Sequence, residues 1–209
     1  MPKEKTLKTE IIQVGSRLYK SGLAQVKSGN ISARLGKNHI LITATGTCLG
    51  SLKPADIVKI NLNTGETKGD KPPSSELPLH SLIYKHFPHS TVIHCHPPLI
   101  NGYFAVNPAL KVLTLETKLY LKCVPVVKQS TVTVTRPGPV ISALKRSSLV
   151  VLKNHGVVVI AYDFTQGLLL IESLEQAVRV AACARLFNKR RFDKLDKALK
   201  LYLSHGHNH

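Results

Sequence analysis

The spacing of apolar residues predicts helices that alternate with strands along this chain. Between residues 7 and 21 apolar side chains recur every three or four positions, as on the buried face of a helix. A longer stretch of this kind runs to about Phe187. It begins at Asp163, a common helix cap, and Gln166 completes a capping box. Further helices are predicted from Ser74 to Phe87, from residue 98 to 106, and shortly after Pro139.

Shorter runs of apolar and β-branched residues predict strands. These runs lie around residues 31–34, 39–43, 57–61, 91–96, 124–127, 131–135, 149–153 and 156–160. Residues 64–73 are polar and contain glycine and proline, so a loop is expected there. Mixed helices and strands with short connections predict an α/β fold, in which helices flank a central, largely antiparallel sheet.

Composition changes this picture little. The 209 residues are 43% apolar with a mean hydropathy of +0.01, which suits one domain over residues 1–209. We expect its core at about residues 7–187 and a basic tail at 188–209. No apolar run reaches the roughly 18 residues that span a bilayer, and the polar start Met1–Lys5 does not resemble a signal peptide. A cytoplasmic protein without a membrane partner is therefore expected.

The net charge of +17 is large for this length. Nucleic-acid binding would explain it, but aromatic residues are only 5% and no nucleic-acid-binding motif is present, so such a partner is not expected. Attraction of anionic, phosphorylated substrates is a second explanation, and a generally basic surface is a third. The four cysteines lack C-x-x-C spacing, which indicates neither a disulfide framework nor a zinc finger.

Two histidines mark the end of the predicted strand at 91–96. His94 and His96 are two positions apart, so on a strand they point to one face while Cys95 points to the core. Zinc takes three or four nitrogen, sulfur or oxygen ligands. His155, between the predicted strands 149–153 and 156–160, supplies a third imidazole. The alternative is chance, because the chain has ten histidines.

Three short polar stretches before this strand suit an anion. They are Ser28-Gly29-Asn30, Thr45-Gly46 and the predicted helix start Ser74-Ser75. Ordinary turns and helix caps use the same residues, so each stretch alone has a simpler explanation. Glu76 at the same helix start is either a general base beside a metal or a carboxylate that complements the helix dipole. His80, one turn later, is expected to pack or to lie on the helix surface.

Five motifs together resemble the class II aldolase/adducin family, and most closely its fuculose-phosphate aldolase branch. They are Ser28–Arg34, Ile42–Gly46, Pro73–Glu76, His94-Cys95-His96 and Asn154-His155-Gly156, and the resemblance spans about residues 7–187.

The resemblance implies a zinc enzyme that cleaves or forms a ketose 1-phosphate, with dihydroxyacetone phosphate and an aldehyde as the fragments. It implies zinc ligation by His94, His96 and His155, and proton transfer by Glu76. It also implies a phosphate pocket, made by Ser28, Gly29, Asn30, Thr45, Gly46, Ser74 and Ser75. Family members are commonly homotetramers with active sites at subunit interfaces.

Some residues depart from the pattern. The fuculose aldolases use a tyrosine from a neighbouring subunit, and the comparable position here holds Glu116. Glu116 resembles the catalytic glutamate of methylthioribulose-1-phosphate dehydratases, so a dehydratase, or a pentulose-phosphate 4-epimerase, is the alternative. Glu76 favours the aldolase, and the three histidines argue against the non-enzymatic adducins. A nucleic-acid-binding or scaffold protein is the third hypothesis. Tyr202, in the tail, is a candidate lid residue.

Overall fold

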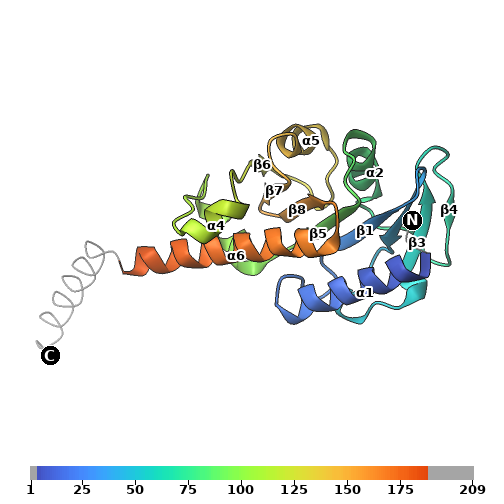
Figure 1. The fold of residues 1–209 in the computed structure, drawn as a ribbon, viewed down its shortest axis with the longest axis horizontal. Coiled ribbons are helices and arrows are strands. Elements are labelled where there is room, and N and C mark those ends of the chain that lie inside the picture. The colour runs from blue at the N-terminus through green and yellow to red at the C-terminus, as the bar shows by residue number, and fades with distance from the viewer. Residues whose placement is uncertain (1–3, 188–209) are drawn as a thin grey trace, which may run out of the picture.

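The computed structural model describes residues 4–187, and there one sheet organises the chain (Figure 1). Its strands are β1 (Asn30–Leu35), β2 (His39–Thr43), β3 (Ile57–Asn61), β4 (Thr67–Lys68), β5 (Thr91–Cys95), β6 (Val126–Lys128), β7 (Leu149–Lys153) and β8 (Gly156–Ala161). They lie in the order β4-β3-β2-β1-β5-β8-β7-β6, and neighbours are antiparallel except β6 and β7. The predicted α/β fold with a largely antiparallel sheet is confirmed.

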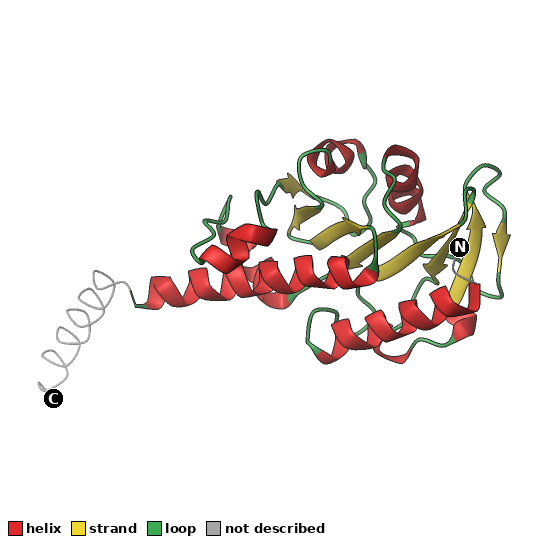
Figure 2. Cartoon of the chain, viewed as in Figure 1, coloured by secondary structure: helices red, strands yellow, loops and turns green. Residues whose placement is uncertain are grey.

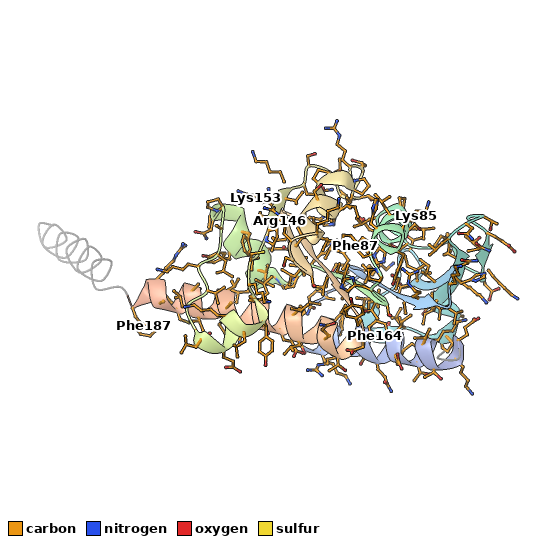
Figure 3. All side chains as sticks on the ribbon, turned by 45° about the horizontal axis from the view of Figure 1, so that its top comes forward. Lys85, Phe87, Arg146, Lys153, Phe164 and Phe187 are labelled. Carbon is orange, nitrogen blue, oxygen red and sulfur yellow. The ribbon has the colours of Figure 1, made fainter. Side chains whose placement is uncertain are left out.

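Helices cover both faces of this sheet (Figures 1 and 2). They are α1 (Glu4–Lys20), α2 (Leu77–His86), α3 (Pro98–Val106), α4 (Leu115–Tyr120), α5 (Gly138–Leu144) and α6 (Phe164–Leu186), with 3-10 turns at Leu49–Ser51 and Pro54–Asp56. Apolar residues of α1, α3 and α6 share one core cluster, and those of α2 and α5 share the other. Along α6 the side chains run from the buried Phe164 to the exposed Phe187 just past its end (Figure 3).

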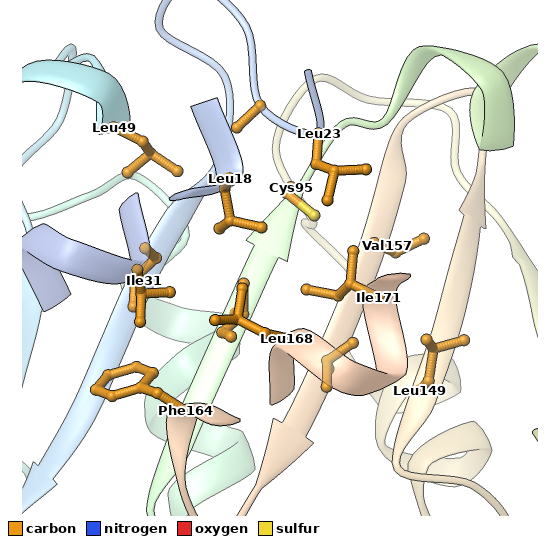
Figure 4. Close-up of a cluster of buried hydrophobic side chains, with 14 of the residues drawn as sticks. Leu18, Leu23, Ile31, Leu49, Cys95, Leu149, Val157, Phe164, Leu168 and Ile171 are labelled. Atoms are coloured by element: carbon orange, nitrogen blue, oxygen red, sulfur yellow. The ribbon is translucent and has the colours of Figure 1, made fainter. Parts of the chain in front are cut away.

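Strand alternation divides the core between the two faces. On β5, Val92 joins the cluster beneath α2 and α5, whereas Ile93 and Cys95 join the cluster beneath α1, α3 and α6. Cys95 lies among Leu18 and Leu23 (Figure 4), as predicted for a core residue. Burying an aliphatic side chain of this kind contributes about 1.5–3 kcal/mol, so this register is strongly fixed.

The predicted strand at residues 131–135 is wrong. The sequence Thr-Val-Thr-Val-Thr alternates as a strand would, but the segment is an irregular loop. Its hydrogen bonds are local: the Thr131 hydroxyl donates to the carbonyl of Thr133 at 2.6 Å, and the Gln129 amide donates to the same carbonyl at 3.1 Å. Side chains that satisfy nearby carbonyls compete with strand pairing, which explains the difference.

Other boundaries differ by a few residues. Helix α2 begins at Leu77 rather than Ser74, because the Ser74 hydroxyl accepts from the backbone N–H of Glu76 in a turn before the helix. The cap of α6 is confirmed: the Asp163 carboxylate accepts from the backbone N–H of Gln166 at 2.7 Å. Helix α4 and the short β4 were not predicted.

Within residues 4–187 no helix has the length and apolar character needed to cross a membrane. The predicted basic tail 188–209, with Tyr202, lies outside the described residues.

Candidate active site

The predicted metal, phosphate and proton-transfer residues all meet at one end of the sheet, whereas Glu116 does not join them and Tyr202 lies outside the described residues. Strands β1 and β5 are antiparallel, so Asn30 at the start of β1 is the cross-strand partner of His94 near the end of β5. The turn between β7 and β8 brings His155 to the same end, and the residue that precedes α2, Glu76, lies there too. Together these segments line a small cleft of about 140 Å³. Residues far apart in sequence are thus gathered by strand pairing.

The three histidines face one another through their Nε2 atoms. The Nε2 of His94 lies 2.8 Å from that of His96 and 3.3 Å from that of His155. The candidate ligand atoms of the three rings all fall within 4.8 Å of one another. His94 is buried, and His96 and His155 are partly buried.

The protonation of this cluster suits a metal cation. The Nδ1 of His94 donates to the carbonyl of Val157 at 2.9 Å, so its Nε2 carries a lone pair. Burial, and then the neighbouring imidazoles, hold the pKa of His94 far below its usual range. Burial also lowers the pKa of His96 to about 4, and it lowers the pKa of His155. Neutral imidazoles whose lone pairs converge are the form that binds a divalent metal, so the donor set fits zinc.

Close packing around the β7–β8 turn holds His155 in place. Asn154 adopts φ +64°, which asparagine tolerates better than most residues. A Cβ added at Gly156 would meet the carbonyl oxygen of Cys95 at 2.4 Å and the His96 ring at 2.7 Å. The Asn101 side chain donates to the carbonyl of His155 at 2.9 Å. The turn therefore requires a glycine so that His155 can approach the other two rings.

Glu76 contributes a buried carboxylate to the cleft. Its side chain is 4% exposed, and its Oε1 accepts from the backbone N–H of Val134 at 3.0 Å. Its Oε2 is buried and has no hydrogen-bond partner among residues 4–187. Burial raises the pKa of Glu76, and the Val134 N–H only partly offsets this. A carboxyl with a raised pKa and one unpaired oxygen is suited to proton transfer.

The residues predicted to hold phosphate line the same cleft. Gly29 has φ +88°, and a Cβ there would meet the carbonyl oxygen of His94 at 2.7 Å, so the loop lies tightly against β5. Ser74 accepts from the Glu76 N–H, which leaves its own hydroxyl hydrogen free to donate. The Ser28 hydroxyl instead donates to the carbonyl of Gln25 at 2.6 Å and closes a turn. Thr45, Gly46 and Ser75 lie at the outer rim, where Thr45 and Ser75 are exposed.

Some cleft residues were not predicted from the sequence. They are Lys27, Ala44, Thr47, Val132 and Thr133. Lys27 directly precedes the predicted Ser28-Gly29-Asn30 loop, and its charge was the available signal. Val132 and Thr133 had no such signal, because the alternating pattern of residues 131–135 predicts a strand there. Glu116 is exposed on α4 and is not among the residues that line the cleft.

Comparison with known proteins gives consistent matches. The family model for the class II aldolase and adducin N-terminal domain matches residues 9–182. An L-fuculose phosphate aldolase of Methanococcus maripaludis is 31% identical over 170 residues, which cover 81% of this chain and 92% of the relative. A 3-oxo-tetronate 4-phosphate decarboxylase of Cupriavidus necator is 30% identical over 192 residues, which cover 86% of this chain and 85% of the relative. The crystal structure of L-fuculose-1-phosphate aldolase from Thermus thermophilus matches with a TM-score of 0.76 and 27% identity, over 87% of this chain and 95% of that one.

Proposed function

The chain belongs to the class II aldolase and adducin family, and on this premise we propose that it is a zinc-dependent aldolase. It would cleave or form a ketose 1-phosphate of the fuculose-1-phosphate type, with dihydroxyacetone phosphate and an aldehyde as the fragments. The observation that carries this proposal is the cleft itself. Three convergent imidazoles, a buried carboxylate and loops suited to an anion meet there.

The proposed zinc ligands are the Nε2 atoms of His94, His96 and His155. Bound zinc would supply a Lewis acid for the oxygens of the substrate that gain negative charge when the carbon–carbon bond breaks. Imidazoles also accept manganese, iron, cobalt or nickel, so the ligand set alone does not rank these metals. Elemental analysis of protein purified without added metal tests this assignment, and a metal content near zero would contradict it.

The chain's own groups would do the remaining work. Glu76 has a raised pKa and an Oε2 without a hydrogen-bond partner among residues 4–187, and it would take and return the proton at C3 of dihydroxyacetone phosphate. The hydroxyl of Ser74, the amide of Asn30 and the backbone N–H groups of the Gly29 and Gly46 loops would hold the phosphate. Binding the phosphate away from the reacting carbons orients the substrate, which lowers the entropy cost of the reaction.

A condensation assay tests the reaction. Metal-loaded protein is incubated with dihydroxyacetone phosphate and a panel of aldehydes, and ketose 1-phosphate formation is followed. The expected result is condensation that requires the metal and is lost in Glu76→Gln. Metal-loaded protein that forms no carbon–carbon bond with any aldehyde would contradict the aldolase assignment.

A decarboxylase is the second candidate, favoured by the 30% identity to the Cupriavidus necator relative. A 3-oxo-tetronate 4-phosphate carries a carboxylate β to its ketone. Loss of carbon dioxide leaves the enediolate of dihydroxyacetone phosphate, so one site could serve either reaction. Release of carbon dioxide from that substrate, together with failure of the condensation assay, would select the decarboxylase.

The dehydratase and epimerase alternatives gain no support from Glu116, because this residue is exposed and outside the cleft. They stay open and are tested by water loss from methylthioribulose 1-phosphate and by epimerisation of a pentulose phosphate. The cytoplasmic location also stays a prediction.

We further propose a homotetramer with active sites at subunit interfaces, supported by exposed apolar side chains at one end of the molecule. Val106 is 80% exposed, Leu115 81%, Leu119 73% and Phe187 78% (Phe187 in Figure 3). Helix α6 contacts both α3 and α4, so these residues come from adjoining helices. Clustered apolar exposure of this kind is typical of protein–protein contact surfaces. Sedimentation equilibrium tests the proposal, and a monomer at micromolar concentration would contradict it.

A further inference from the structure

Behind the cleft, four polar side chains form one buried chain of hydrogen bonds between β1 and α2. The Nε2 of His80 lies 2.6 Å from the Oδ1 of Asn30. The Nδ1 of His80 lies 2.6 Å from the Oγ of Ser32, which in turn lies 2.9 Å from the Oη of Tyr84. His80 and Ser32 are 0% exposed, Tyr84 is 5% exposed and Asn30 is 7% exposed. Because these groups are buried, removing one of them leaves its partner without a hydrogen bond, which lowers the free energy of unfolding.

Sequence spacing explains how these side chains meet. Glu76, His80 and Tyr84 are four residues apart along α2, so they share one face of that helix. Asn30 and Ser32 are two residues apart on β1 and therefore share the face that carries α2. The segment that presents the Glu76 carboxylate is thus joined through His80 to the strand that presents Asn30.

The chemistry of the four groups sets the direction of the hydrogen bonds. Burial lowers the pKa of His80 to about 3, so the ring is neutral, with one N–H and one lone pair. The Oδ1 of Asn30 can only accept, so the Nε2–H of His80 donates to it. The Nδ1 then accepts from the Ser32 hydroxyl, and the Tyr84 hydroxyl donates to Ser32. In this arrangement the amide oxygen of Asn30 accepts the hydrogen bond from His80. The NH2 group of Asn30 can then donate into the cleft that Asn30 lines.

We propose that His80 is a positioning residue that fixes the Asn30 amide with its NH2 group toward the cleft, where that group donates to the substrate phosphate. The phosphate as ligand rests on the proposed function, whereas the orientation of the amide rests on the hydrogen bonds alone. Without the His80 N–H the amide can rotate, and its oxygen then faces the anion. His80 touches neither the substrate nor the imidazole cluster in this scheme.

Two substitutions separate this role from simple packing. His80→Gln keeps an N–H near the Nε2 position, whereas His80→Asn keeps a polar atom near Nδ1 and loses the contact with Asn30. Inorganic phosphate is titrated into each full-length, metal-loaded variant by calorimetry. His80→Asn is expected to weaken phosphate binding by about 10-fold, the loss typical of one hydrogen bond to a charged group. His80→Gln is expected to stay within about 2-fold of the unsubstituted protein.

Controls exclude a general loss of structure. His86→Asn changes an exposed histidine on the same helix and is expected to leave phosphate affinity unchanged. Asn30→Ala should weaken phosphate binding as much as His80→Asn does, and the double variant should lose no more than either single variant. Equal weakening in His80→Gln and His80→Asn, or additive losses in the double variant, would overturn the proposal.

The tautomer of His80 provides a measurement that does not depend on any variant folding. Imidazole nitrogen shifts of histidine-labelled protein should show His80 protonated at Nε2 and bare at Nδ1, with and without phosphate. Protonation at Nδ1 would overturn the proposal. If condensation fails while phosphate binding and the tautomer behave as stated, the aldolase assignment fails and the role of His80 stands. If the unsubstituted protein does not bind phosphate, the phosphate role of His80 is refuted.

Discussion

Replacing Glu76 by glutamine is expected to stabilise the metal-free protein while removing its activity. Glutamine has nearly the same shape, and its oxygen can keep the hydrogen bond from the Val134 N–H. Its NH2 group takes the place of Oε2, which has no hydrogen-bond partner in the described residues. The substitution therefore changes little except the buried negative charge.

The sign of the effect follows from the direction of the pKa shift. Burial raises the folded-state pKa of Glu76 above its ordinary value of 4.5. Above pH 4.5 the unfolded chain gives up this proton more readily, so ionisation favours unfolding. The resulting loss in the free energy of unfolding grows as the pH rises to the folded-state pKa of Glu76 and is constant above it. Each unit of elevation corresponds to about 1.4 kcal/mol, or roughly 3–5 °C in Tm for a chain of this size.

The measurement is thermal unfolding of chelator-treated protein at pH 4 and pH 8. Glu76→Gln should unfold at a higher temperature than the unsubstituted protein at pH 8, and at nearly the same temperature at pH 4. Glu66→Gln, at an exposed position, is the control and should show no such difference. In the condensation assay Glu76→Gln should lose about 10²- to 10⁴-fold in rate. An equal rise in unfolding temperature at both pH values, or a lower unfolding temperature at pH 8, would refute the argument from burial.

Three further changes have defined outcomes. Gly156→Ala should destabilise the protein by about 1–3 kcal/mol and reduce its metal content, because the new Cβ would meet the Cys95 carbonyl at 2.4 Å. Gly138→Ala should not reduce metal content, because a Cβ there would meet no other segment of residues 4–187 within 4 Å. His96→Ala should abolish both metal retention and condensation while the protein stays folded, as elemental analysis and circular dichroism would show; full metal content would contradict ligation. Asp163→Ala should lower the free energy of unfolding by about 0.5–2 kcal/mol in urea titrations without changing the reaction rate, because it removes only the cap of α6.

The histidine cluster could be predicted because its signals are local. Strand alternation places His94 and His96 on one face whatever surrounds them, and Asn154-His155-Gly156 indicates a turn by itself. That these groups meet follows only from pairing of β5 with β8. In the sequence, only the resemblance to a family indicated that pairing.

The surroundings of the cluster could not be predicted, because they depend on contacts between distant segments. The hydrogen bond from Val134 to Glu76 joins residues 58 positions apart, and residues 131–135 have a pattern that favours a strand. His80 was expected to pack or to lie at the surface, and its partner Asn30 is 50 positions away. Contacts between segments this far apart leave no signal in the local pattern of residues.

The spacing of the histidines also has a consequence for folding. His94 and His155 are 61 positions apart, and the segment between them contains α3, α4, β6, α5 and β7. An ion bound by both residues in the folded chain would join the ends of this long loop. Because the unfolded chain has no preformed site, the binding free energy of the ion would stabilise the folded state. The imidazole cluster would then act as a reversible cross-link, and removal of the ion would increase hydrogen exchange first in residues 98–153.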